Sequence, residues 1–386
     1  MAQSSDAVSS HPLTVETTTT QKNRSTGTLT CPPPELPTLP FDVLPEILCR
    51  LPVKLLVQLR CLCKFFNSLI SDPKFAKKHL QLSTKRHHLM VTSKNNLGEL
   101  VHHDSPIPSL FSTSTVITQT QLYPPTNLTN GHKFMLVRCY CDGIFCCVVL
   151  NGVSFFLWNP SIRKFKLLPP LENSRGHVFQ ISFGYDHFID DYKVIGVSSE
   201  NEVSVYTLGT DYWTRIKDIP YSDPIYGNGV FVSGTVNWLA CDDSCILSLD
   251  LEKESYQQLF LPDFENENDS LILSVLRDCL CVFATIDRIL NVWIMKEYGN
   301  RESWTKLYSV PNMQDRGLDA YEDLEPYTVS YISEDDQLLV GFFHFQSRIR
   351  KLVVYDSKTD TLNIPEFQNN YEPEYSNVYI ESLISP

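Results

Sequence analysis

The sequence predicts a multidomain α+β protein in which a small all-α unit precedes a much larger all-β domain. Two observations predict this architecture. Apolar residues recur at helical spacing between residues 39 and 82, whereas from residue 86 onward they form short strand-like runs that turn residues interrupt about every ten residues. The 386 residues are enough for two or three domains, and 42% hydrophobic residues can supply a large core.

Residues 1–36 differ in composition from everything that follows. They are rich in Ser, Thr and Pro and show no hydrophobic period, so we predict a disordered tail. They also lack the apolar run of a secretory signal, and no stretch of the chain approaches the ~20 apolar residues that span a bilayer. We therefore expect a protein of the cytoplasm, the nucleus or both, with no membrane partner.

Residues 37–82 predict three or four short helices. Four apolar residues follow the spacing of a single helical stripe: Leu44, Ile47, Leu48 and Leu51. Pro52 is expected to end that helix. Further helical runs are predicted over Leu55–Leu62, Phe65–Ile70 and Phe75–Leu82. About forty residues bury too little apolar surface for independent stability, so this helical unit is expected to lean on a partner.

Residues 86–386 repeat one hairpin pattern five times. Each copy has an apolar strand, a polar turn, a second strand and a terminal proline: Phe155–Pro169, Val205–Pro220, Ile246–Pro262, Val292–Pro311 and Leu352–Pro365. The prolines are 42 to 54 residues apart, which is typical of β-propeller blades. A kelch-like propeller of six or seven blades fits the 301 residues, and a pair of β-sandwiches is the competing architecture.

Charge divides the chain in the same place. Residues 37–90 contain nine Lys and Arg against three Asp and Glu, a net charge of +6, and residues 91–386 contain 21 against 39, a net charge of −18. The total of −13 has the wrong sign for a protein that wraps nucleic acid, so we expect no nucleic-acid partner. The basic rim of the helical unit suits an acidic, hydrophobic partner surface.

The motifs of common enzyme and metal sites are absent. The sequence has no Gly-rich phosphate loop, no His-Glu-x-x-His, no Gly-x-Ser-x-Gly and no CxxC pair, so we predict no catalytic residue, no cofactor and no metal site. The adjacent pairs His87-His88 and His102-His103 are predicted in solvated loops, and Asp190-Asp191 and Asp242-Asp243 in turns. The twelve cysteines are expected to be free thiols, most of them small core residues.

Two groups of segments carry a resemblance to a known family. The first reads LPFDVLPEILCRLPVK at 39–54, RCLCK at 60–64 and SDPKF at 71–75. The second reads LWNPSIRK at 157–164, FGYD at 183–186, DDYKV at 190–194 and GTVNWL at 234–239. In this order the segments resemble plant F-box proteins that carry a C-terminal F-box-associated, kelch-like domain. The resemblance implies an F-box over residues 37–82 and a substrate-binding β-propeller over residues 86–386.

The resemblance also implies partners. An F-box of that family docks on a Skp-type adaptor and through it joins a cullin, while the C-terminal domain holds a protein substrate for ubiquitination by other subunits. The adaptor-binding residues are then expected to be Leu39, Pro40, Leu44, Ile47, Leu51, Pro52, Leu59, Leu62, Lys64 and Phe66. The family usually has Trp in place of Phe66, and this departure predicts weaker adaptor binding. It also usually has Cys-Asn-Gly where this chain has Cys141-Asp142-Gly143.

Two other functions stay open on the sequence alone: a ligase-independent scaffold, and a propeller enzyme that acts on a small molecule. The substrate is not indicated by any motif. The net charge of −18 on residues 91–386 favours a substrate with a basic surface, and the alternative is that this charge only keeps a large β domain in solution.

Overall fold

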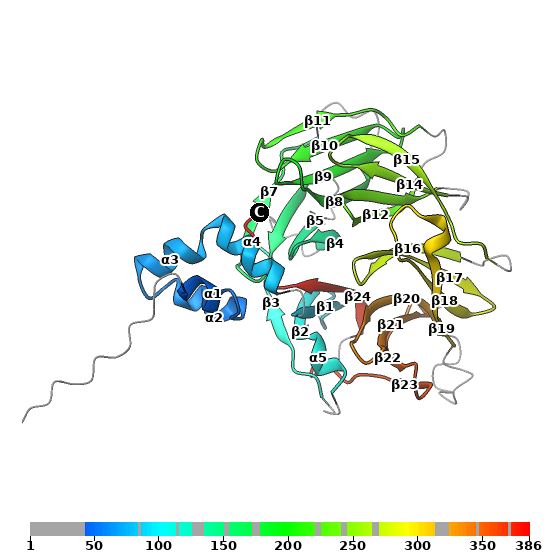
Figure 1. Ribbon diagram of the computed structural model, residues 1–386. Helices are drawn as coiled ribbons and strands as arrows, with labels where there is room; N and C mark the ends of the chain where they lie inside the picture. The colour runs from blue at the N-terminus through cyan, green and yellow to red at the C-terminus, as the bar shows by residue number, and fades with distance from the viewer. Residues whose placement is uncertain are drawn as a thin grey trace, which may run out of the picture.

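The computed structural model describes residues 43–386 except for 84–85, 113–115, 126–134, 150–153, 172–177, 221–224, 241–244, 265–269, 313–323, 345–346 and 370–371. The predicted tail over residues 1–36 lies outside the described residues. Four short helices come first and are followed by a ring of β-sheets, as Figure 1 shows in blue and in cyan through red.

The helices are α1 (Leu44–Leu48), α2 (Val53–Leu59), α3 (Lys64–Ile70) and α4 (Pro73–Leu82). The first helix ends before Leu51, earlier than the apolar stripe predicts, and Pro52 is the residue that precedes α2. The longest helix, α4, has the clearest start. Asp72 accepts a hydrogen bond from the backbone N–H of Lys74 at 2.7 Å, and Pro73 occupies the first turn, where no donor is lost.

The β domain consists of six four-stranded antiparallel sheets over the described residues. Five sheets are continuous in sequence: β4 (Met135–Cys141), β5 (Ile144–Val149), β6 (Phe155–Asn159) and β7 (Lys164–Leu167); β8 (Val178–Asp186), β9 (Asp191–Ser198), β10 (Val203–Thr207) and β11 (Tyr212–Arg215); β12 (Tyr226–Val232), β13 (Thr235–Leu239), β14 (Cys245–Asp250) and β15 (Ser255–Phe260); β16 (Ser270–Leu276), β17 (Cys279–Ile286), β18 (Ile289–Met295) and β19 (Trp304–Val310); β20 (Glu325–Ile332), β21 (Gln337–Phe343), β22 (Arg350–Asp356) and β23 (Thr361–Asn363). A short 3₁₀ helix, η2 (Arg301–Ser303), precedes β19.

The sixth sheet closes the ring with both ends of the domain. Its strands are β24 (Pro373–Ile380), β1 (His87–Lys94), β2 (Leu100–Pro106) and β3 (Thr120–Leu122), and the short helix α5 (Ile107–Leu110) lies between β2 and β3. The C-terminal strand β24 pairs with β1 from His87↔Ile380 onward, and Figure 1 shows the two side by side in red and cyan. This closure leaves the ring no open edge between its first and last blades.

The predicted propeller is therefore confirmed, with six blades, and the β-sandwich alternative is wrong. The five repeated hairpins of the sequence are the two outer strands of the five continuous blades. The closing blade has no such copy, because its inner strand comes from the far end of the chain and α5 interrupts its outer pair.

Three of the inner hairpin turns use two successive residues with positive φ, a conformation that fits the twist of a two-residue hairpin. They are Asp142-Gly143, Ser233-Gly234 and Arg277-Asp278. Asp142 has φ 50°, which Asp tolerates as Asn does, so the departure from Cys-Asn-Gly keeps the same turn. Gly143 is also required by space, because a Cβ there would collide with the carbonyl of Ile380.

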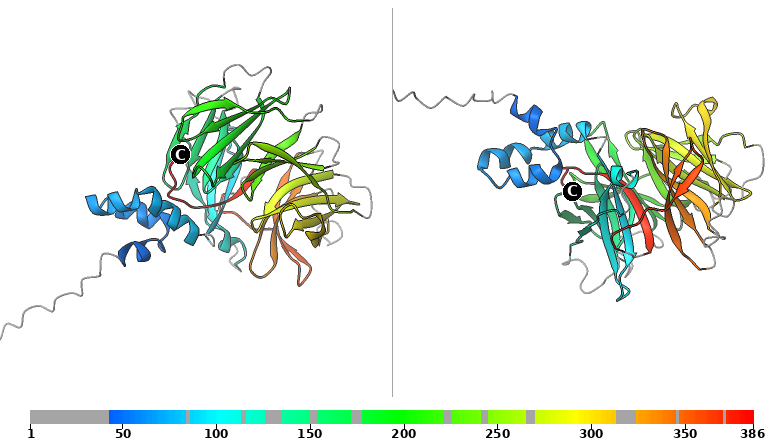
Figure 2. Two further views of the ribbon diagram at one scale, coloured as in Figure 1. Left: turned by 45° about the horizontal axis from the view of Figure 1, so that its top comes forward. Right: turned by 90° about the horizontal axis from the view of Figure 1, so that it is seen from below.

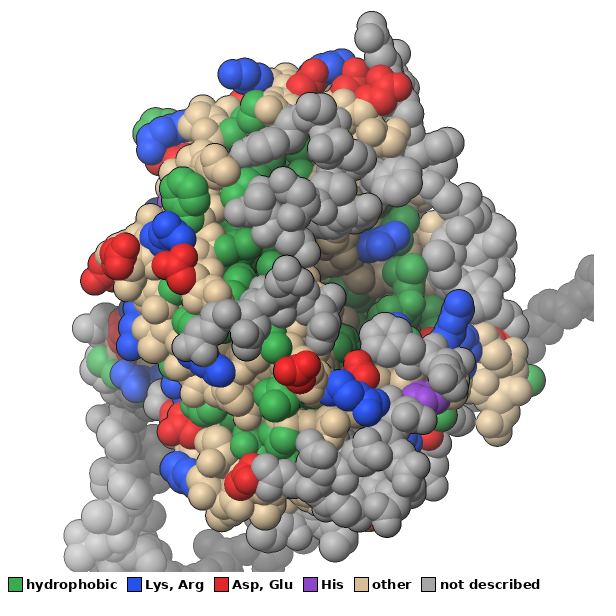
Figure 3. Space-filling model, turned by 90° about the vertical axis from the view of Figure 1, so that its right-hand side faces the viewer, with side chains coloured by type: hydrophobic (Ala, Val, Ile, Leu, Met, Phe, Trp, Pro, Cys, Tyr) green, Lys and Arg blue, Asp and Glu red, His purple; other side chains and the backbone are tan. Residues whose placement is uncertain are grey.

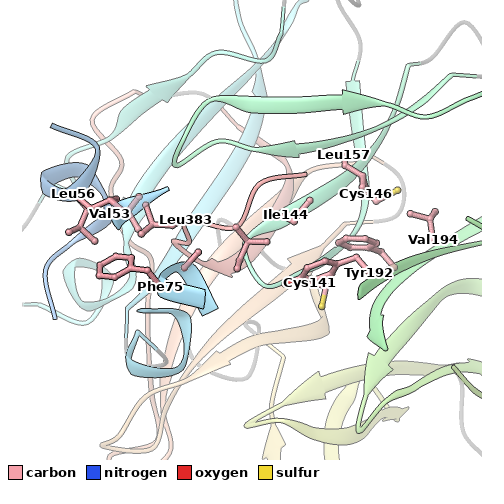
Figure 4. Close-up of a cluster of buried hydrophobic side chains, with 14 of the residues drawn as sticks. Val53, Leu56, Phe75, Cys141, Ile144, Cys146, Leu157, Tyr192, Val194 and Leu383 are labelled. Atoms are coloured by element: carbon pink, nitrogen blue, oxygen red, sulfur yellow. The ribbon is translucent and has the colours of Figure 1, made fainter. Parts of the chain in front are cut away.

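The helical unit packs against the propeller of its own chain. One buried cluster contains Val53, Leu56 and Phe75 from the helices together with Ile144 and Leu157 from the first continuous blade. Figure 4 shows these side chains in a row that runs from the helices, at the left, through Ile144 to Leu157 of the propeller. The small core that the sequence predicts for the helices is thus completed within the molecule.

The histidine prediction is wrong. His87 and His88 lie in β1, His102 and His103 lie in β2, and the last two are buried. Both pairs lie in strands of the closing blade, where burial comes from chain segments far away in sequence. Asp190 does lie in a turn, Asp191 begins β9, and Asp242-Asp243 lies outside the described residues.

The ten cysteines within the described residues are free thiols. Over the same residues there is no group of three His, Cys, Asp or Glu side chains arranged to hold a metal ion, and no helix is long and apolar enough to cross a membrane.

Candidate functional site

The apolar side chains of the helices fall into two groups by their exposure. The inward side chains are buried: Leu48, Cys49, Val53, Leu56, Ile70 and Phe75. The outward side chains are exposed: Val43, Ile47, Leu55, Leu62 and Phe65. Leu62 is the most exposed of these, at 68%. Exposed apolar side chains at this density, on a unit of four short helices, are typical of a protein-binding surface. We call Val43, Ile47, Leu55, Leu62 and Phe65 the outer apolar surface.

The structure divides the predicted adaptor-binding residues into three groups. Leu39 and Pro40 lie outside the described residues. Four are exposed: Ile47, Pro52, Leu62 and Lys64. Four are half-buried and pack against the buried cluster that the helices share with the propeller: Leu44, Leu51, Leu59 and Phe66. The structure therefore brings Ile47 and Leu62 to the outer apolar surface and turns the second group partly inward.

Sequence reasoning missed three residues of the outer apolar surface, namely Val43, Leu55 and Phe65. The pairs Leu55-Leu56 and Phe65-Phe66 contained a signal, because adjacent residues of a helix point about 100° apart and cannot both face the core. In the structure Leu56 is buried while Leu55 is 46% exposed. Phe65 is exposed beside Phe66, with their rings edge to face at 5.6 Å.

The helical unit also exposes basic side chains. Arg50, Lys54, Lys64 and Lys74 are exposed, and Lys78 forms an ion pair with Glu46 inside the helical unit. Lys77 points the other way, toward the propeller, where it donates a hydrogen bond to the Tyr185 hydroxyl at 3.2 Å and pairs with Asp190. The Tyr185 hydroxyl also donates a hydrogen bond to the Asp190 carboxyl. The hydrogen bond from Lys77, and next the one from Tyr185, lower the pKa of that carboxyl.

Comparison with protein families decides the identity of both parts. The model of the F-box domain matches residues 36–78, and the model of the F-box associated beta propeller domain matches residues 94–386. The chain belongs to the F-box associated β-propeller family. The helical unit is its F-box.

Curated relatives match this chain over most of their length. The chain is 29% identical over 377 residues to the F-box/kelch-repeat protein At3g23880 of Arabidopsis thaliana, covering 90% of this chain and 96% of the relative. It is 27% identical over 392 residues to the F-box protein CPR1 of Arabidopsis thaliana, covering 90% and 89%. Among solved structures, a chain of a nidogen/laminin complex aligns with a TM-score of 0.45 at 10% identity, covering 76% of this chain and 99% of that chain.

The segments that carry the family resemblance in the propeller are structural. Asp186 is buried, accepts hydrogen bonds from the backbone of its own turn and pairs with Lys193 at 2.8 Å. Lys193 reaches on to the carbonyl of Leu251 at 2.6 Å in the next blade. Asn237 accepts a hydrogen bond from the Tyr298 hydroxyl at 2.7 Å. These residues join turns and blades of the ring.

The propeller face away from the F-box is hollowed at its centre, where Figure 3 shows hydrophobic side chains gathered. The inner strands of the ring also carry exposed side chains that suit contact with a protein, among them Arg138 of β4 and Ile272 of β16. Where β22 and β24 begin, the Arg350 guanidinium lies between the rings of Phe343 and Tyr375, at 4.9 and 5.2 Å from their centroids. Such stacked Arg and aromatic groups are frequent in protein-binding surfaces.

Proposed function

We propose that this protein is the substrate-recognition subunit of a Skp–cullin–F-box ubiquitin ligase of the cytoplasm or nucleus. Its F-box binds a Skp-type adaptor and through it a cullin, and its propeller binds a protein substrate. The protein makes no bonds itself. It holds the substrate near the ubiquitin-bearing subunits, and proximity converts a slow encounter into an efficient transfer.

The observation that carries the proposal is the outer apolar surface of the F-box. A unit that already shares a core with the propeller has no internal reason to leave Leu62, Leu55 and Phe65 in water. Apolar anchors of this kind provide most of the affinity of a protein interface, and exposed basic residues of the F-box raise the rate at which an acidic partner associates.

The proposal places the substrate on the face away from the F-box. That face is the hollowed one in Figure 3, and the blade connections there, where side chains vary at little cost to the ring, include the one between β21 and β22. The net charge of −18 over residues 91–386 supports a substrate with a basic surface.

The test replaces outward side chains only. The full-length double variant L62A/F65A is compared with wild type and with L97A, which removes a 79% exposed leucine from the turn between β1 and β2 of the propeller. We expect L62A/F65A to lose adaptor and cullin on co-purification, with adaptor affinity at least ten-fold weaker, because each anchor contributes on the order of 1–2 kcal/mol. L97A should bind as wild type does.

Equal recovery of adaptor and cullin by L62A/F65A and wild type would refute the proposal and favour the scaffold or enzyme alternatives. A thermal melt of each variant accompanies the binding measurement. Because the two substituted side chains are exposed, the melting temperature should stay within about 2 °C of wild type.

A further inference from the structure

The last six residues do not end in solvent. After β24 stops at Ile380, residues 381–386 run from the closing blade toward the F-box, and the C-terminus lies beside α4 and β7 in Figure 1. Both views of Figure 2 place it between the helices and the blades. Ser382, Leu383 and Ile384 are all buried. We call residues 381–386 the C-terminal strap.

The propeller binds the C-terminal strap mainly through hydrogen bonds to the backbone carbonyls of the strap. The buried Asn159 amide donates hydrogen bonds to the carbonyl of Ser382 at 3.1 Å and to the carbonyl of Ile384 at 2.8 Å. Lys164, beyond the same turn, donates to the Ser385 hydroxyl at 3.1 Å. The turn at Gly143 packs so closely on Ser382 that a Cβ would not fit. These contacts fix the path of the strap on the first continuous blade.

The F-box holds the other side of the strap through apolar contact. Leu383 and Ile384 belong to the buried cluster that contains Val53, Leu56 and Phe75 of the helices. In Figure 4 Leu383 lies between Val53 and Phe75 on one side and Ile144 of the propeller on the other. The strap is therefore the middle layer of the contact between the two domains.

Two further attachments lie elsewhere on the F-box. Lys77 of α4 binds Tyr185 and Asp190 of the turn between β8 and β9. Arg86, at the start of the propeller, donates to the Leu51 carbonyl at 2.6 Å, and the His79 ring also contacts that carbonyl at 2.9 Å. Because the F-box is attached to the propeller at three separate places, it cannot rotate relative to the propeller as it could on a single linker.

We infer that the C-terminal strap is a positioning element that holds the F-box in one orientation on the propeller. Under the proposed function, on which this consequence rests, the strap fixes the distance between the adaptor-binding surface and the substrate-holding face. A fixed distance keeps the effective concentration of the substrate at the ubiquitin-bearing subunits constant, whereas a freely rotating F-box would dilute it.

The experiment measures orientation directly. Spin labels are attached through a ketone-bearing amino acid at Gln58 of α2 and at Leu97 of the propeller, both exposed, which avoids the twelve cysteines. Distance distributions are recorded by pulsed electron resonance for wild type, for L383A/I384A and L383A, and for the control I349A, which trims an exposed isoleucine between β21 and β22. We expect one narrow distance for wild type and I349A, a broadened distribution for L383A and the broadest for L383A/I384A.

Unchanged narrow distributions in both strap variants would overturn the inference. It would also be overturned if L383A lost the near-ultraviolet dichroism of the buried Trp158 and Trp238, because the strap would then support the propeller fold itself. Adaptor co-purification on the same variants separates the two proposals. A broadened distance with no adaptor bound in any variant, wild type included, keeps the positioning role and refutes the ligase function.

Discussion

The F-box and the propeller form their hydrophobic cores in different ways. The F-box is made of four helices of 5 to 10 residues, and its buried side chains belong to a cluster that continues through Leu383 and Ile144 into the propeller. The propeller draws its core from six blades packed on one another, and it is complete only when β24 reaches β1 across the whole length of the domain. The F-box therefore depends on a neighbour, whereas the propeller depends on closure.

Breaking closure should have the largest effect. Deletion of residues 376–386 removes most of β24 and the strap, leaves β1 without its inner partner and exposes the edge of β1. It also removes Tyr379, whose hydroxyl donates to Asp104 of β2 at 2.9 Å. We expect the truncated protein to aggregate, because the loss is comparable to the whole stability of a domain, roughly 5–15 kcal/mol.

Size-exclusion chromatography with light scattering checks this prediction. The matched control deletes only residues 385–386, which lie beyond the buried part of the strap. A monomeric, soluble protein after deletion of residues 376–386 would show that the ring does not need its last strand.

The closing blade should also carry most of a measurable pH response, through two histidines of opposite behaviour. Burial, and next the charge of His103, lower the pKa of His102 to about 4. Since an unfolded histidine has a pKa of 6.5, the neutral form is favoured in the fold, and stability present above pH 6.5 is lost as the pH falls toward 4. The shift corresponds to roughly 3 kcal/mol. Urea unfolding of wild type and H102Q at pH 7 and at pH 4.5 should show a much smaller pH dependence in H102Q.

His88 should respond in the other direction. Burial alone would lower its pKa, but the hydrogen bond from its ring to Asp104 at 2.9 Å and the charge of Glu381 raise it. A raised histidine pKa contributes stability that is full below pH 6.5 and is lost as the pH rises through the folded pKa. H88Q should therefore flatten the alkaline side of the stability profile and leave the acid side to His102. If the unfolding free energy of H88Q and of wild type changed equally with pH above pH 6.5, the raised pKa of His88 would not be the cause of that pH dependence.

The difference between the two domains also explains what the sequence could predict. The hairpins from Phe155 to Pro365 were visible because each repeats a local pattern, and they proved to be blade strands. The closing blade does not repeat this pattern, although closure of the ring by a terminal segment was expected. His102 and His103 read as a polar pair in a solvated loop, and only the pairing of strands from the two ends of the domain shows that they are buried.

The site was predicted less well than the fold for a related reason. Spacing identifies an apolar stripe, but it does not tell which of Leu55 and Leu56 meets the propeller and which is left for another protein. That choice depends on where the propeller lies. The contact between the strap and the helices was missed because Leu383 and Ile384 form a short apolar run with no period, and their partners on α2 and α4 lie more than three hundred residues away in the sequence.

The opposite charges of the two domains lead to the smallest effect. With +6 over residues 37–90, the F-box should attract an acidic adaptor before contact, whereas residues 91–386, at −18, should not. K64A removes an exposed charge next to the outer apolar surface, and K306A removes an exposed charge from β19 as its control.

We expect K64A to slow adaptor association about two- to three-fold at ~0.05 M salt and to leave the dissociation rate almost unchanged, because rim charges act mainly on association. The difference should vanish near ~0.5 M salt, where the Debye length falls to about 4 Å. Stopped-flow or surface plasmon resonance measures both rates, and a K64A effect that persists at high salt would mean that Lys64 makes a close contact in the complex instead of steering it.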